Sequence, residues 1–170
     1  MSDWLDLYAL EAEPRPGGVA IYLSAGDLSR GLVRLGRHFG DALGAYVFAI
    51  GPRSKEAAGW GADRVVEGGS LRSFVEKFAP EIVLFDASDG SIEQAARLGQ
   101  QLGRSLLGPA FEAAVDPSTR LVVAKIRTYG GRQIEEVTAG EWRPQLIVME
   151  RESLPPAQED TGRRVESIRI

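Results

Sequence analysis

The sequence contains no cysteine, a single histidine and only three lysines. Without cysteine there can be no disulfide, no thiolate nucleophile and no cysteine-ligated metal. One histidine, His38, rules out a histidine-rich metal site and any catalytic pair of histidines. No apolar run approaches the roughly 20 residues of a membrane helix, and the first residues lack the basic stretch and apolar core of a secretory signal. We therefore expect a cytoplasmic protein with no membrane insertion and no metal site.

The net charge and the length of the chain limit the classes of partner and fold that we expect. The chain has 24 acidic and 20 basic residues, a net charge of −4, which disfavours nucleic acid as a partner. Its 170 residues, 44% of them hydrophobic, suit one domain with a sizeable core. The missing histidines and cysteines leave no obvious nucleophile or base, so we expect no catalytic residues and disfavour an enzyme.

The sequence divides into three segments. Residues 1–18 form a leader, residues 19–155 a single α/β domain, and residues 156–170 a tail. The leader is apolar near its start and then rich in proline and glycine, so it either folds back over the domain or docks on a partner. Its apolar residues are Trp4, Leu5, Leu7, Tyr8 and Leu10. In the tail, Val165, Ile168 and Ile170 predict a strand that joins a sheet edge, in this chain or in a neighbouring one.

The first part of the domain alternates between strands and helices. Short apolar runs at 19–23, 46–50, 61–66 and 82–85 are typical of strands buried on both faces. Between them, helices are predicted over 27–43 and over 71–78, the latter capped by Ser70. A third helix is predicted to begin at a capping box formed by Ser91 and Gln94. This alternation predicts a three-layer α/β/α fold with a mainly parallel sheet.

The pattern changes after Gly103. Strands are predicted over 111–115, 121–126, 133–138 and 146–149, with no room for helices between them. Turn signals stand at 116–119 and at Gly130–Gly131. We therefore expect C-terminal antiparallel hairpins to extend the parallel sheet.

This order of elements is similar to the N-terminal domain of the electron transfer flavoprotein α subunit. The matching stretches are Gly61–Val65, Phe85–Gly90 with Ala95–Gly103, Gly108–Tyr129 and Pro144–Met149. The resemblance implies an adenine nucleotide alpha hydrolase-like fold. It also implies association with an electron transfer flavoprotein β-like subunit, or self-association.

In that family the FAD-binding domain follows the N-terminal one, whereas here few residues follow Pro155. We therefore expect no cofactor on the isolated chain, with FAD, and AMP if it is used, held through a partner. The resulting functional prediction is protein association within a flavoprotein electron-transfer system. The alternative is a non-catalytic protein that binds a small molecule, an adenine nucleotide.

Two loops are candidates for ligand contact. Ser24 and Gly26 follow the first strand, and Ser88, Asp89, Gly90 and Ser91 follow the fourth. Helix N-termini at such positions hold anions, and ligands of open α/β sheets bind at the carboxyl ends of strands where strand order switches. The competing interpretation is that these residues only cap helices and form turns.

Other polar and aromatic residues are weaker candidates for a functional role. Asp86 and Asp89 are a conceivable carboxylate pair, but nothing nearby in the sequence supplies a reacting group. His38 is placed with Arg30, Arg34 and Arg37 on a solvated helix face. Trp142 is either an interface anchor or packs beneath its own hairpin. Glu135, Glu136 and Glu141 are expected to be exposed charges that discourage pairing at the sheet edge.

Overall fold

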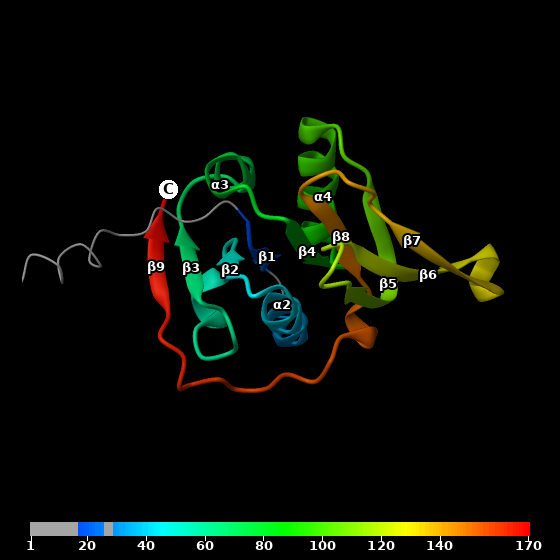
Figure 1. The fold of residues 1–170 in the computed structure, drawn as a ribbon. Helices are drawn as coiled ribbons and strands as arrows, with labels where there is room; N and C mark the ends of the chain where they lie inside the picture. The colour runs from blue at the N-terminus through cyan, green and yellow to red at the C-terminus, as the bar shows by residue number, and fades with distance from the viewer. Residues whose placement is uncertain (1–16, 26–28) are drawn as a thin grey trace, which may run out of the picture.

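A computed structural model describes residues 17–25 and 29–170. Nine strands form one mixed sheet in the order β7-β6-β5-β8-β4-β1-β2-β3-β9 (Figure 1). The predicted leader and the start of the helix predicted over 27–43 lie outside the described residues, apart from Gly17 and Gly18. The strands are β1 (Val19–Tyr22), β2 (Val47–Ile50), β3 (Arg64–Glu67), β4 (Ile82–Asp86), β5 (Leu106–Val115), β6 (Val122–Thr128), β7 (Gln133–Thr138), β8 (Gln145–Met149) and β9 (Glu166–Arg169).

Helices cover both faces of the parallel part of the sheet. Helix α2 (Arg30–Leu43) packs on one face, while α3 (Leu71–Phe78) and α4 (Asp89–Leu102) pack on the other (Figure 1). Each central strand is buried on both faces, as continuous apolar runs such as Val19–Tyr22 predict. The predicted α/β fold with helices on both sides of a mainly parallel sheet is therefore confirmed. Single 3₁₀ turns occupy Ser54–Ala57, Tyr129–Gly131 and Arg151–Ser153.

Local sequence signals explain where the helices end. Ser70 caps α3 by accepting a hydrogen bond from the backbone N–H of Ser73 at 3.0 Å, as predicted. Gly44 and Gly103 close α2 and α4 in the left-handed conformation, with φ of 61° and 62°. The predicted capping box at Ser91 is wrong, because α4 begins two residues earlier, at Asp89, after Ser88.

One strand is not where the sequence placed it. The strand at 146–149 was expected among the antiparallel hairpins, but β8 runs parallel between β4 and β5. Its register sets Val83 opposite Leu146 and Leu84 opposite Ile147, so β8 is a fully buried central strand. Among the strands of the described residues, only β5, β6 and β7 form antiparallel pairs.

The bend in β5 joins the two parts of the sheet. β5 begins at Leu106, earlier than predicted, pairs parallel to β8, and then turns to pair antiparallel to β6 from Ala110. Gly108 sits at this bend with φ of 121°, and a Cβ there would collide with the carbonyl oxygen of Val148. A glycine is therefore required at the bend.

The tail forms a ninth strand, as predicted. Residues after Pro155 run past α2, on the face of the sheet that this helix covers, and β9 then pairs parallel to β3, with Val65 opposite Ser167 (Figure 1). Arg163 anchors this crossing through Asp63 at 2.9 Å and Asp160 at 2.8 Å. The added strand belongs to this chain rather than to a neighbour.

Arg37 does not lie on a solvated face, as the sequence had suggested. It is buried and pairs with Asp63 at 2.7 Å and Asp41 at 2.8 Å. Asp63 also accepts the backbone N–H of Val47 at 2.8 Å, so one carboxylate joins α2, β2 and β3. His38 is exposed, as predicted.

Candidate functional site

The candidate ligand loops meet where the strand order switches. β1 continues through α2 to β2 on one side, whereas β4 continues through α4 and the hairpins to β8 on the other. β1 and β4 are adjacent and parallel, but the connections that follow them run in opposite directions along the sheet. The strand order therefore switches between the carboxyl ends of β1 and β4. Ser24 follows β1 and Ser88 follows β4, and their hydroxyl oxygens lie 3.4 Å apart.

The carboxylate of Asp86, the last residue of β4, is at the centre of this site. Its side chain is buried and accepts hydrogen bonds from the hydroxyls of Ser29 and Ser88, the latter at 2.6 Å. The backbone N–H of Ser88 donates to it at 3.3 Å, and the guanidinium of Arg151 lies 3.7 Å away. We call Ser24, Ser29, Asp86, Ser88 and Ser91 the switch-point cluster.

The donors around Asp86 outweigh the effect of its burial. Burial alone raises the pKa of this carboxyl, but the hydrogen bonds from Ser29 and Ser88, together with the nearby Ser91 hydroxyl, favour the charged form and bring the pKa below its ordinary value. Asp86 is therefore an anion at neutral pH. A general acid near pH 7 needs the opposite shift, which argues against an acid role for an Asp86–Asp89 pair.

Two helices begin at this cluster without a side-chain cap. Ser29 precedes α2 and Ser88 precedes α4, yet neither hydroxyl accepts a hydrogen bond from its helix. Both instead donate to Asp86. The first-turn N–H groups of the two helices, which carry partial positive charge, therefore receive no hydrogen bond from the Ser29 or Ser88 hydroxyl.

Ser91 adds a buried hydroxyl to the same place. It is fully buried in the first turn of α4, and its Oγ makes no hydrogen bond of normal geometry to any described residue. Its proximity nevertheless contributes to lowering the pKa of Asp86, so the hydroxyl faces the cluster. Gly90 lies beside the Ser24 side chain, where an added Cβ would make ordinary contact at 3.7 Å.

The predicted site residues are thus partly brought together. Ser24, Ser88 and Ser91 belong to the cluster, and Asp89 and Gly90 are exposed at the start of α4. Gly26 lies outside the described residues. Sequence reasoning missed Ser29 and Arg151 as neighbours of Asp86. Arg151 follows β8, and its position was hidden because β8 was not expected to lie beside β4.

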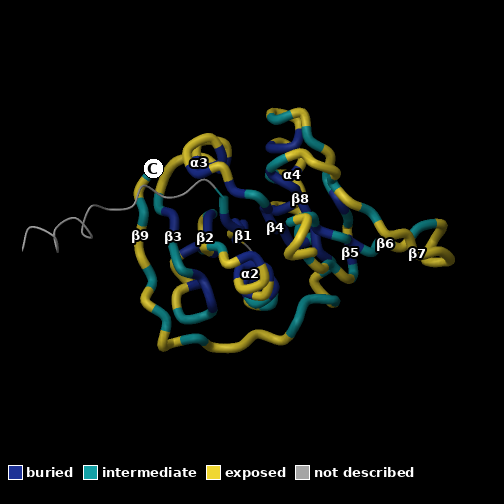
Figure 2. Tube along the Cα trace, viewed as in Figure 1, coloured by how far each residue is buried: buried dark blue, intermediate teal, exposed yellow. Residues whose placement is uncertain are grey.

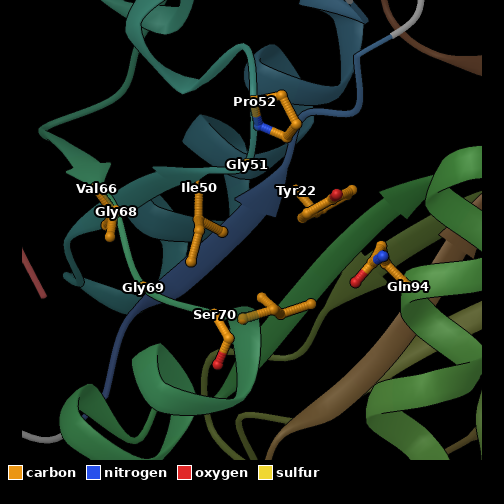
Figure 3. Close-up of a pocket in the computed structure, with 10 residues that line it drawn as sticks. Tyr22, Ile50, Gly51, Pro52, Val66, Gly68, Gly69, Ser70 and Gln94 are labelled. Carbon is orange, nitrogen blue, oxygen red and sulfur yellow. The ribbon is translucent and has the colours of Figure 1, made fainter.

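A cavity of about 390 Å³ lies at the same edge of the sheet, on the side of α3 and α4 (Figure 3). Tyr22 from the end of β1 and Gln94 from α4 line it, together with the backbone of Gly68 and Gly69 before α3. Burial, and then the charge of Glu93, raises the pKa of the Tyr22 phenol, which stays a neutral donor. The volume is at the lower end of the range for ligand pockets.

A second surface of interest lies at the β7 edge of the sheet, away from the switch-point cluster. Hairpin β6–β7 extends away from the helices, and its outer strand is almost entirely exposed (Figures 1 and 2). Of the five large hydrophobic side chains exposed in the described residues, Tyr129 at 74% and Ile134 at 63% lie on this hairpin, and Trp142 at 65% follows the base end of β7. We call this surface, comprising β6, β7 and Trp142, the hairpin face.

Trp142 is exposed rather than packed beneath its hairpin. The Arg104 guanidinium lies 4.8 Å from its ring centroid, and the ring borders a hollow of about 300 Å³ between the start of β5 and the end of β7. Glu135, Glu136 and Glu141 are exposed, as predicted. Exposed tryptophan and tyrosine with a stacked arginine are the residue types that dominate binding at protein interfaces.

Within residues 17–25 and 29–170, no group of three or more histidine, cysteine, aspartate or glutamate side chains is arranged to hold a metal ion. None of the described helices has the length and apolar character needed to cross a membrane. Neither the protein-family models nor the curated proteins compared with this chain match it.

Proposed function

We propose that this protein is a protein-association domain of the electron transfer flavoprotein α type, which works beside a β-like subunit in a flavoprotein electron-transfer system. In this proposal it has the adenine nucleotide alpha hydrolase-like fold of those domains. FAD, and AMP where it is used, is held mainly by the partner. Self-association is the other mode of assembly that the proposal allows.

The hairpin face is the observation that carries this proposal. A sheet edge whose outer strand is exposed on both sides, next to exposed Tyr129, Ile134 and Trp142, is costly for a chain that acts alone. Covering such a surface with a partner removes apolar area from water and pairs the open backbone groups. The mostly parallel sheet, extended by the antiparallel strands β6 and β7, supports the α/β fold class that the proposal requires.

The test is co-expression with an electron transfer flavoprotein β subunit. We expect the two chains to elute together in gel filtration. A Trp142→Ala variant should weaken the complex, whereas Ile92→Ala, which truncates an exposed apolar side chain of α4 away from the hairpin face, should not. Separate elution of the wild-type chains, together with the absence of a homodimer at micromolar concentration, would contradict the proposal.

The switch-point cluster favours a second candidate, a non-catalytic adenine nucleotide-binding protein. Two helix N-termini without serine caps and the buried hydroxyl of Ser91 support this candidate as a phosphate site, and the cavity at the same edge of the sheet supports it as a place for the base. The anionic Asp86 opposes a phosphate at close range, so the nucleotide would have to bind on the outer side of Ser24 and Ser88.

Titration with AMP tests this candidate. If it holds, AMP raises the melting temperature of the wild-type protein, and Ser91→Ala reduces that increase. Ser167→Ala, which removes an exposed hydroxyl in β9, is the matched control and should respond like the wild type. An equal response, or none, in all three proteins rules out this site.

A further inference from the structure

Strand β7 is an open edge of the sheet and carries two adjacent glutamates, Glu135 and Glu136. It pairs with β6 alone, in a register that sets Lys125 opposite Glu136 and Ile126 opposite Glu135. Five of its six residues are exposed. Its outward N–H and C=O groups are therefore a template for another strand.

The two cations of β6 are already engaged on the other side of the hairpin. Lys125 pairs with Glu112 at 2.7 Å, and Arg127 pairs with Glu150 at 2.6 Å. Glu135 accepts a hydrogen bond from the hydroxyl of Thr128 at 3.0 Å. Among the described residues, neither glutamate of β7 forms an ion pair within 4 Å, so β7 presents two adjacent negative charges, one on each face of the sheet.

These charges oppose pairing of β7 with a second copy of itself. In an antiparallel pair centred on the middle of the strand, Glu135 of one copy would lie opposite Glu136 of the other, and the same contact would occur twice. Like charges directly opposite each other destabilise a ladder, and opposite charges stabilise it. An arriving strand with cations at these two positions would meet no such repulsion, and Ile134 and Val137 would flank the pairs with apolar contacts.

We propose that β7 is a strand-addition edge for a partner protein whose own edge strand carries lysine or arginine opposite Glu135 and Glu136. This inference rests on the proposed role in protein association and names the edge and the chemistry of the partner. The glutamates then have two effects, because they keep copies of this chain from pairing through β7 and they select a basic strand.

The chain itself supplies the probe. In the Glu135→Lys/Glu136→Lys variant, the same strand becomes basic, and an antiparallel pair with wild-type β7 sets each lysine opposite a glutamate. Because the chain has no cysteine, a single Gln133→Cys substitution in each protein gives a unique labelling point at the start of the exposed strand. Donor-labelled wild type is titrated with acceptor-labelled variant, and energy transfer is measured.

We expect the mixed pair to associate about tenfold or more tightly than either protein associates with itself through β7, with the effect weakening as salt is added. The matched control is Glu152→Lys/Glu159→Lys, which makes the same change in net charge at two exposed glutamates away from β7. It should give no energy transfer with the wild type. Melting curves of all variants check that they are folded.

Three outcomes would overturn the inference. The first is no energy transfer in the mixed pair when the acceptor-labelled variant is in 100-fold excess over the donor-labelled wild type. The others are equal energy transfer with the control variant and strong energy transfer between copies of the wild type alone. None of these involves a flavoprotein subunit. If the mixed pair forms and the β subunit does not bind, the proposed function fails while the strand-addition edge stands. If the β subunit binds and the mixed pair does not form, only this inference fails.

Discussion

Replacing Asp86 by asparagine should destabilise the protein strongly at neutral pH and progressively less in acid. Asparagine keeps the shape of the side chain and one acceptor oxygen, but it removes the charge to which Ser29 and Ser88 donate. Hydrogen bonds to a charged group contribute about 1.5–3 kcal/mol each. Allowing for the acceptor that remains, we expect the free energy of unfolding at pH 7 to fall by about 2–4 kcal/mol.

Arg151 adds little to this figure. Its Nε lies 3.7 Å from the carboxylate and its side chain is 39% exposed, so solvent screens the pair to under about 1 kcal/mol. Asp86→Ala, which leaves both serine hydroxyls without their acceptor, should cost about 3–6 kcal/mol. That is a large part of the 5–15 kcal/mol that stabilises a typical domain.

The pH dependence gives the sharper test. The pKa of Asp86 is lower in the folded protein than in the unfolded chain, so its contribution is fully present above the unfolded-state value of about 3.9. It is lost as the pH falls through the lower folded-state pKa. The stability gap between wild type and Asp86→Asn should therefore be constant from pH 7 to about pH 5 and narrow below pH 4.

Urea unfolding followed by tryptophan fluorescence at several pH values measures that gap, and the difference between the two proteins cancels the contributions of the other carboxylates. Ser118→Ala, which removes an exposed donor to Asp116 in a turn, is a control expected to change stability by less than about 0.5 kcal/mol. A gap below that size at pH 7, or one that widens in acid, would refute the description of Asp86 as a stabilised anion.

Three further predictions concern other parts of the chain. Asp63→Ala leaves the buried guanidinium of Arg37 without its main partner and should cost about 3–5 kcal/mol in urea unfolding, whereas Asp63→Asn should cost less. Deleting residues 157–170 removes β9 and the Arg163 anchor, so the melting temperature should fall; an unchanged value would mean that β9 adds nothing. Trp142→Ala should change the unfolding free energy of the isolated chain by no more than about 1 kcal/mol, because it removes only an exposed ring and its Arg104 contact, so a larger loss in calorimetry would make Trp142 structural.

Local signals in the sequence predicted the elements whose causes are local. The Ser70 cap and the apolar face of α3 lie within nine residues of chain, and both are present in the structure. The start of α4 was misplaced because Ser88 and Ser91 both suit a helix start. What favours Ser88 is its bond to Asp86, at the end of the preceding strand.

Features that depend on distant partners were beyond the sequence. A charged residue at position 37 of an amphipathic helix indicates solvent, but Asp63, 26 residues away, makes burial of Arg37 possible. Likewise, nothing in the run Leu146–Met149 distinguishes a hairpin strand from a central parallel one. The contacts that hold the start of β8 are distant in sequence: the amide of the fully buried Gln145 accepts from the backbone of Val122 at 2.8 Å and donates to the carbonyl of Arg120 at 3.0 Å.

The two ends of the sheet differ in how far their polar groups are satisfied, and this difference favours association over ligand binding as the main role. At the switch point, Asp86 has its donors within the chain, and among the buried side-chain groups of the described residues the Ser91 hydroxyl alone has no hydrogen-bond partner. At the hairpin face a whole strand of backbone groups, two glutamates and three large apolar side chains remain open. A second protein can cover exposed apolar area and pair an open strand edge, whereas a single buried hydroxyl needs only a small molecule as its partner. Binding therefore stabilises the hairpin face more than it stabilises the switch point.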